Sequence, residues 1–183
     1  MAGHLLFLAF VCVPAVCAQE ANPQPTPLTA PPPFKTILKE ERLQIDQTND
    51  SKKRLKITME LALAHLGLAE QHTAQANYET ASAEVGLYHA LIENALDFLT
   101  TVKRDSDKSR DLYKRLELAL RGQGPRLTAM RRITPLEFAV WIKQVEDFAR
   151  EGRTEALNSF YGHTVVREPQ KPKETPTPKS NQP

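Results

Sequence analysis

Histidine is the side chain whose charge changes most readily near neutral pH, and three of the five histidines in this sequence lie in one stretch. His65, His72 and His89 all fall between residues 57 and 102. His65 and His72 are seven residues apart, and a helix would separate them by about 10.5 Å along its axis. That separation is too long for the two rings to chelate one ion.

His89 is the better partner for His65 if the chain folds back on itself near residue 76. Reflection about that turn places His65 opposite position 87, near His89 and with Glu93 close by. Two imidazoles and a carboxylate form a ligand set that zinc and related ions accept. Because there is no H-E-x-x-H or other chelating spacing, the sequence predicts no metal and no other cofactor. His65, His89 and Glu93 are left as the candidates for a metal site, and the alternative is that they are solvated or hydrogen-bonded.

Two carboxylate pairs have the side chains that acid–base catalysis uses, Glu40 with Glu41 and Glu93 with Asp97. Almost any charged helix has pairs at such adjacent or one-turn spacing. The sequence has no G-x-S-x-G nucleophile turn, no G-x-x-x-x-G-K phosphate loop and no G-x-G-x-x-G dinucleotide turn. It therefore predicts a protein that is not an enzyme and has no catalytic residues.

The net charge of +2 hides an uneven distribution of charged residues. The 46 residues from Ile57 to Val102 contain six acids and no Lys or Arg, whereas Lys103 to Arg132 contains ten basic and four acidic residues. One interpretation is that the acidic segment packs beside the basic one and the two neutralise each other. The other is a basic face that binds an anionic partner.

The candidates for that basic face come from one expected helix and the short piece that follows it. They are Arg110, Lys114, Arg115, Arg121, Arg126, Arg131 and Arg132. Anionic lipid, lipopolysaccharide, a wall polymer or an acidic protein fits such a face outside the cytoplasm. Nucleic acid is not predicted as a partner, because the basic segment has one aromatic residue, Tyr113, and the chain has no helix-turn-helix, zinc-finger or RNA-recognition signature.

The first eighteen residues indicate export. Leu5 to Cys17 is an apolar run that is too short for a comfortable membrane span and typical of a signal peptide, with a cleavage site after Ala18. A buried segment, an uncleaved anchor or a lipid attachment are the alternatives, although Val16 is unsuited to a lipid attachment at Cys17. Both cysteines, Cys12 and Cys17, would be removed with the peptide, so the mature chain is expected to have no disulfide, no thiolate chemistry and no transmembrane span.

Two proline-rich stretches flank the expected domain. Residues 19–33 hold six prolines and one charge, and residues 163–183 hold five prolines with four basic and two acidic residues. Such composition favours an extended, solvated chain over a packed core, so both stretches are predicted to be disordered. Solvated linkers are the favoured interpretation, and a tether or a ligand for a proline-reading partner is the alternative.

The remaining residues, 34–162, show only helical periodicity. Helices are expected over residues 34–48, 52–74, 78–102, 108–121 and from Thr134 to Gly162, with a short helical piece reaching residue 132. Gly122-Gln123-Gly124-Pro125 should stop or kink the fourth helix, and Thr134-Pro135-Leu136-Glu137 should cap the last one. Residues 52–74 carry two apolar stripes, which indicates a helix contacted from two sides. The fold class is all-α, a four- to five-helix bundle or an array of helical hairpins.

One segment resembles a single tetratricopeptide unit. Leu68-Ala69 occupies the place of the large–small pair in a first helix, and Asn77-Tyr78-Glu79-Thr80-Ala81 is similar to the opening of a second. The sequence shows no second copy, and about three repeats are needed for a stable solenoid. A generic helical hairpin is therefore the favoured interpretation.

These observations predict an exported, non-enzymatic helical protein that acts as an interaction or scaffold module of the bacterial envelope. The partner would be an envelope protein or an anionic surface component, and a second copy of the chain is a further option for covering the apolar faces. The alternative function is a ligand-binding or sensing bundle for a metal ion or an anionic envelope component.

Overall fold

The computed structural model describes residues 29–102 and 107–161 of the chain. These residues form five helices and no strand, so the all-α prediction is confirmed for the described part of the chain. The helices are α1 (Lys39–Asp46), α2 (Ser51–Ala74), α3 (Tyr78–Thr101), α4 (Asp107–Ile133) and α5 (Leu136–Tyr161). The predicted signal peptide, most of the proline-rich linker and the predicted C-terminal tail lie outside the described residues.

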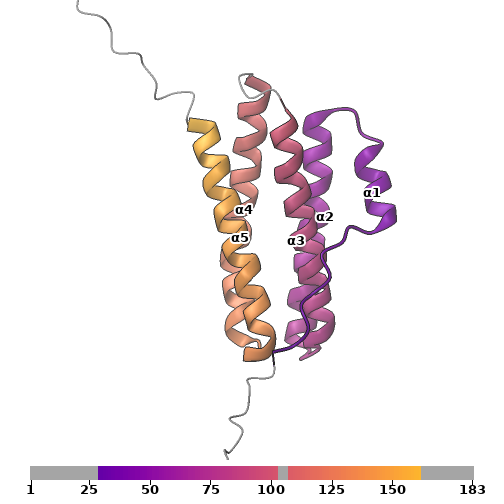
Figure 1. Cartoon of the computed structure of the whole chain (residues 1–183), viewed down its shortest axis with the longest axis vertical. Helices are drawn as coiled ribbons and strands as arrows, with labels where there is room; N and C mark the ends of the chain where they lie inside the picture. Colours follow the sequence, from indigo (N-terminus) through magenta and orange to yellow (C-terminus); the bar gives the residue numbers. More distant parts are fainter. Residues whose placement is uncertain (1–28, 103–106, 162–183) are drawn as a thin grey trace, which may run out of the picture.

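Two helical hairpins lie side by side in the bundle (Figure 1). α2 packs against α3 and α4 against α5, and the hairpins meet through α2 on α4 and α3 on α5. α1 lies on the outside of the first hairpin and contacts α2. Each helix from α2 to α5 runs opposite to the one before it, so α2 and α4 point the same way along the bundle (Figure 1).

The bundle core is built from apolar stripes at helical spacing. All five residues of the first stripe predicted for α2 are buried: Leu55, Met59, Ala62, Leu66 and Ala69. The second stripe is less covered than a helix contacted from two sides would require, because Ile57 and Leu61 are half-buried and Leu68 is 41% exposed. The hydrophobic effect therefore fixes one face of α2, and the other face remains partly open to solvent.

Gly122-Gln123-Gly124-Pro125 was predicted to stop or kink the fourth helix, and the predicted stop is wrong. α4 runs without interruption from Asp107 to Ile133, with Pro125 in its interior. Leu120 and Leu127 lie on either side of the proline and are both almost fully buried. We infer that burial of this continuous apolar face outweighs the backbone hydrogen bond that proline removes.

The predicted cap of the last helix also differs from the structure. The hydroxyl of Thr134 donates a hydrogen bond of 2.8 Å to the carbonyl of Met130, at the end of α4. The carbonyl of Pro135 accepts the first hydrogen bond of α5, from the amide of Ala139 at 2.9 Å. Thr134 therefore closes the preceding helix instead of opening the following one.

An extended strap, Thr29–Leu38, precedes α1 where the sequence analysis expected helix from residue 34. The amide of Ala30 donates to the carbonyl of Glu137 at 3.1 Å, and the carbonyl of Ala30 accepts from the indole Nε1 of Trp141 at 2.8 Å. The strap thus runs from the start of α5 across α3 to α1 (Figure 1). The packed part of the chain starts ahead of the predicted domain boundary at residue 34.

Gly86 is the point where the strap crosses α3. A Cβ atom at Gly86 would lie 2.4 Å from the carbonyl oxygen of Phe34. Any side chain there would therefore clash with the strap, and the backbone would have to move. We expect Gly86→Val to push the strap away from α3 and to expose the indole of Trp141, the single tryptophan of the chain. Its fluorescence emission should shift to the red.

Gly122→Ala is the matched control for this variant, since a Cβ atom at Gly122 has no neighbour within 4 Å. Alanine there should leave the emission unchanged and stabilise the helix by roughly 0.5–1 kcal/mol. Identical emission from the wild type and Gly86→Val would show that the strap does not depend on this close approach.

Candidate functional site

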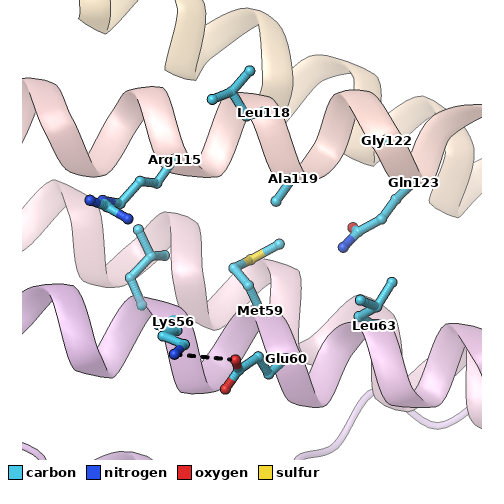
Figure 2. A pocket seen from close by; sticks show the side chains of 10 residues that line it. Lys56, Met59, Glu60, Leu63, Arg115, Leu118, Ala119, Gly122 and Gln123 are labelled. Carbon is cyan, nitrogen blue, oxygen red and sulfur yellow. Dashed lines mark ion pairs between the residues drawn. The ribbon is translucent and has the colours of Figure 1, made fainter.

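A groove of about 530 Å³ lies between α2 and α4, where the two hairpins meet (Figure 2). α2 contributes Leu55, Lys56, Met59, Glu60 and Leu63, and α4 contributes Arg115, Leu118, Ala119, Gly122 and Gln123. Met59 and Ala119 lie between the two helices, and Gly122 opens the wall because it has no side chain. Leu63 and Leu118 are 44% and 50% exposed, so the groove presents apolar side chains to solvent.

The charged side chains of the groove lie at its edges. Lys56 and Glu60 form an ion pair of 3.7 Å one turn apart on α2, and both side chains are largely exposed. Arg115 pairs with Asp111 on α4 at 3.0 Å. Since these charges are paired with each other, the groove offers an apolar floor with a nearly neutral polar rim.

Two ion pairs hold α2 and α4 together beyond the ends of the groove. Lys52 contacts Asp111 at 2.9 Å on one side, and the guanidinium of Arg126 binds Glu70 through two hydrogen bonds of 2.7 and 2.5 Å on the other. The two pairs are ~27 Å apart along α2, given the rise of a helix. The two pairs join the helices at either end of the groove, and between them Leu63 and Leu118 remain partly exposed.

A buried hydrogen bond lies behind the groove. The hydroxyl of Tyr88 on α3 donates to Oε1 of Gln123 on α4 at 2.9 Å. Burial raises the pKa of Tyr88, although the nearby charge of Arg126 acts in the opposite direction, so the hydroxyl keeps its proton and remains a donor. Gln123 therefore supports the floor of the groove from inside the bundle.

The candidates for a basic face do not form one acid-free surface. Five of them pair with carboxylates: Arg110 with Asp107, Arg115 with Asp111, Arg121 with Glu117, Arg126 with Glu70 and Arg131 with Glu146. Arg110 lies 3.8 Å from Asp107, and Arg110 and Lys114 lie 5.9 and 6.0 Å from the ring centre of Phe160. Arg132 is exposed near the end of α4. Within the described residues, one of the six acids of the segment Ile57–Val102, Glu70, forms an ion pair with the basic segment, through Arg126.

Glu117 is the most buried carboxylate of the basic helix. Its side chain is 4% exposed, accepts hydrogen bonds from Arg121 at 2.8 and 2.9 Å, and accepts one from Arg153 of α5 at 3.0 Å. Burial by itself would raise the pKa of Glu117, but the two guanidinium groups outweigh it and hold the pKa below its usual range. Glu117 and Arg153 thus join α4 to α5, and the charge of Arg121 is paired with Glu117.

The predicted metal candidates do not come together. His65 faces α1 and α3, whereas the ring of His89 packs on Phe148 of α5 with the ring centres 4.4 Å apart, and Glu93 is exposed. Burial, with help from the charge of Lys35, lowers the pKa of His89 to about 4. Within residues 29–102 and 107–161, no three His, Cys, Asp or Glu side chains are grouped as a metal ion would require.

His65 instead bridges two carboxylates. Its Nδ1 lies 2.6 Å from Oε2 of Glu84 on α3, and its Nε2 lies 2.7 Å from Oε1 of Glu41 on α1. Burial alone would lower the pKa of His65, but the hydrogen bonds and negative charges of Glu84 and Glu41 outweigh it and raise the pKa above its usual value. The carboxylates meet opposite edges of the ring, so the three groups cannot share one ion.

Several of these polar groups were missed by the sequence analysis. Gln123 and Glu117 received no role, Glu84 was counted only among the six acids of the acidic segment, and Glu41 was considered only as part of an adjacent carboxylate pair. The useful signal for Glu117 was its place four residues before Arg121, the spacing at which helical side chains meet. No comparable signal existed for Glu41 and Glu84, because their partner His65 lies on another helix.

Comparison with known proteins finds no family model, no curated protein and no solved structure that matches this chain. None of the helices in the described residues is long and apolar enough to cross a membrane. Any functional conclusion must therefore rest on the groove and on the buried polar clusters.

Proposed function

We propose that this chain is a non-enzymatic helical binding module whose α2–α4 groove accepts an amphipathic helix of a partner protein. The observation that carries the proposal is the exposure of Leu63 and Leu118 beside an apolar floor, between two helices that ion pairs join beyond both ends of the groove. A helix that lays its apolar face into such a groove is a recurrent mode of peptide recognition. The nearly neutral rim favours a partner helix with short polar residues at the edges of its apolar stripe.

The setting we propose is outside the cytoplasm, as a part of the bacterial envelope. The apolar run Leu5 to Cys17, followed by small residues up to Ala18, supports export, and the sequence of the mature chain would then contain no cysteine. An envelope protein is the kind of partner we propose. The absence of recognisable catalytic motifs in the sequence favours binding over turnover.

The test uses photo-crosslinking residues placed at position 63 in the groove and at position 68 on the same helix. Leu63 and Leu68 are 44% and 41% exposed, but only Leu63 lines the groove. We expect position 63 to crosslink a partner in the native host that position 68 does not. Crosslinks of equal yield from both positions would contradict a groove-specific interaction.

Binding of the captured partner, once purified, should respond to a charge in the groove. Leu63→Asp would place a carboxylate against the apolar face of the partner helix, and we expect Kd to rise at least tenfold, which corresponds to about 1.4 kcal/mol. Leu68→Asp, at matched exposure outside the groove, should leave Kd unchanged. An equal loss in both variants, or no loss in Leu63→Asp, would overturn the proposal.

A further inference from the structure

The strongest feature outside the groove is the contact that holds α1 on the bundle. α1 has eight residues, which is shorter than the ~12–15 residues that an isolated helix needs to be even marginally stable in water. Its buried side chains are Ile45 and Glu41. Leu43 is 53% exposed, so α1 has little other apolar surface with which to anchor itself.

Glu41 therefore supplies a buried polar attachment, beside the ion pair of 3.2 Å between Asp46 of α1 and Arg54 of α2. One carboxylate oxygen lies 2.7 Å from Nε2 of His65 on α2, and the other accepts a hydrogen bond of 3.2 Å from the amide of Leu38 at the start of α1. The same carboxylate thus caps the helix and joins it to the bundle. A charge that is 9% exposed is stable only when it stays paired.

The two hydrogen bonds of His65 require its protonated form. Each ring nitrogen faces a carboxylate oxygen, at 2.6 Å from Glu84 and 2.7 Å from Glu41. An imidazolium has an N–H on both nitrogens, whereas neutral imidazole has one N–H and one lone pair. After loss of the proton, one of the two carboxylates would face a lone pair at hydrogen-bond distance.

We propose that His65 is a pH-sensitive clamp that holds α1 against α2 and α3 while it is protonated and releases α1 when it loses its proton. Glu41 is the carboxylate that leaves, because α1 is short and weakly anchored while Glu84 belongs to the long, well-packed α3. Release lets the carboxylate of Glu41 reach water, while its cap at Leu38 lies within the released segment.

The charged groups around the clamp come from each neighbouring helix. Glu41 of α1 and Glu84 of α3 are the groups that act on His65. On the side that faces α4, the guanidinium of Arg126 approaches α2 at Gly67, and its charge is paired with Glu70. The clamp is thus separate from the groove, which lies on the side of α2 that faces α4.

The direction of the pH effect follows from linkage. Docking of α1 gives His65 a pKa above its usual value, so the stabilisation is complete below the usual imidazole pKa and is lost as the pH rises through the raised value. Between the usual imidazole pKa and the raised pKa of His65, the equilibrium constant for docking of α1 should fall by up to tenfold per pH unit, as expected for the loss of one proton. Above the raised pKa it should level off. α1 is therefore docked at low pH and progressively less docked as the pH rises through the raised pKa of His65.

The experiment is an NMR titration of the full chain from pH 5 to 9. It follows the ring carbons of His65 together with the amide exchange of Leu43 and Ile45, corrected for intrinsic exchange rates. We expect the protection of the α1 amides to be lost over the same pH range in which His65 titrates. Constant protection across the titration of His65 would overturn the proposal.

Glu41→Gln separates a clamp from a merely structural contact. The amide of the new side chain can donate to the lone pair of neutral His65, while the His65 N–H donates to Glu84, so α1 should stay docked at high pH and the pH step should disappear. A step that persists in Glu41→Gln would contradict the mechanism. This variant keeps the size of the side chain, so it also guards against a fold lost by truncation at His65.

His89→Gln is the matched control. His89 is buried like His65, at 8% and 7% exposure, but its pKa is lowered to about 4, so it stays neutral throughout the titration. We expect this variant to keep the full pH step of α1. Loss of the step in His89→Gln would assign the pH response to general destabilisation and overturn the role of His65.

Discussion

Tyr88→Ala is expected to lower the free energy of unfolding by about 3–5 kcal/mol, the usual cost of truncating a buried aromatic residue. Tyr88 has no exposed surface and packs where α3 of the first hairpin meets α4 of the second. Truncation would leave a cavity there and would remove the partner of Gln123, which is itself 4% exposed. Chemical denaturation of the wild type and the variant measures the difference.

Tyr88→Phe divides this effect into packing and hydrogen bonding. Phenylalanine keeps the ring but leaves Oε1 of Gln123 without its donor, and the expected cost is about 1–3 kcal/mol. Leu136→Ala is the surface control, since Leu136 is 81% exposed and its truncation should change stability by less than about 0.5 kcal/mol. A loss below about 1 kcal/mol in Tyr88→Ala would show that the two hairpins do not depend on this contact.

Pro125→Ala is expected to raise the free energy of unfolding by up to about 3 kcal/mol, the cost of proline relative to alanine inside a helix. Pro125 lies in the interior of α4, where it cannot donate to the carbonyl of Arg121. Its side chain is exposed, so alanine restores this donor without opening a cavity in the core. Thermal and chemical denaturation both report the gain.

Pro135→Ala is the matched control for this prediction. Pro135 precedes α5, where the helix does not require its amide as a donor. Alanine there should lower stability by up to about 1 kcal/mol, because the unfolded chain becomes more flexible. A Pro125→Ala variant that is less stable than the wild type would mean that α4 gains more from the fixed backbone angle of proline than it loses in hydrogen bonding.

The periodicity of the sequence predicted the long helices closely. α2 and α3 begin and end within one residue of the expected ranges, and the short turn between them gives the expected antiparallel hairpin. Apolar residues at three- and four-residue steps must face a common core, so the pattern alone fixes such helices. Short-range motifs were less reliable, since burial of Leu120 and Leu127 carries α4 through Pro125.

The basic face shows why charge patterns along a sequence do not by themselves identify a surface. Arg126 and Arg131 looked like candidates for an anionic partner, but the fold brings Glu70 of α2 and Glu146 of α5 to them. The distance in sequence gives no information about which helix will lie alongside. An ion pair between helices depends on their relative rotation and axial position, and packing of the whole bundle sets both.

By itself, the sequence determined the helical class of the described part of this protein, the course of α2 and α3 and the first buried stripe of α2. These are local properties, because each depends on residues within a few turns of one another. Only the tertiary structure decided that α2 and α4 leave a groove between them, and that His65 joins Glu41 to Glu84. Both arise from contacts between separate helices, and their geometry depends on side-chain packing that no single helix encodes.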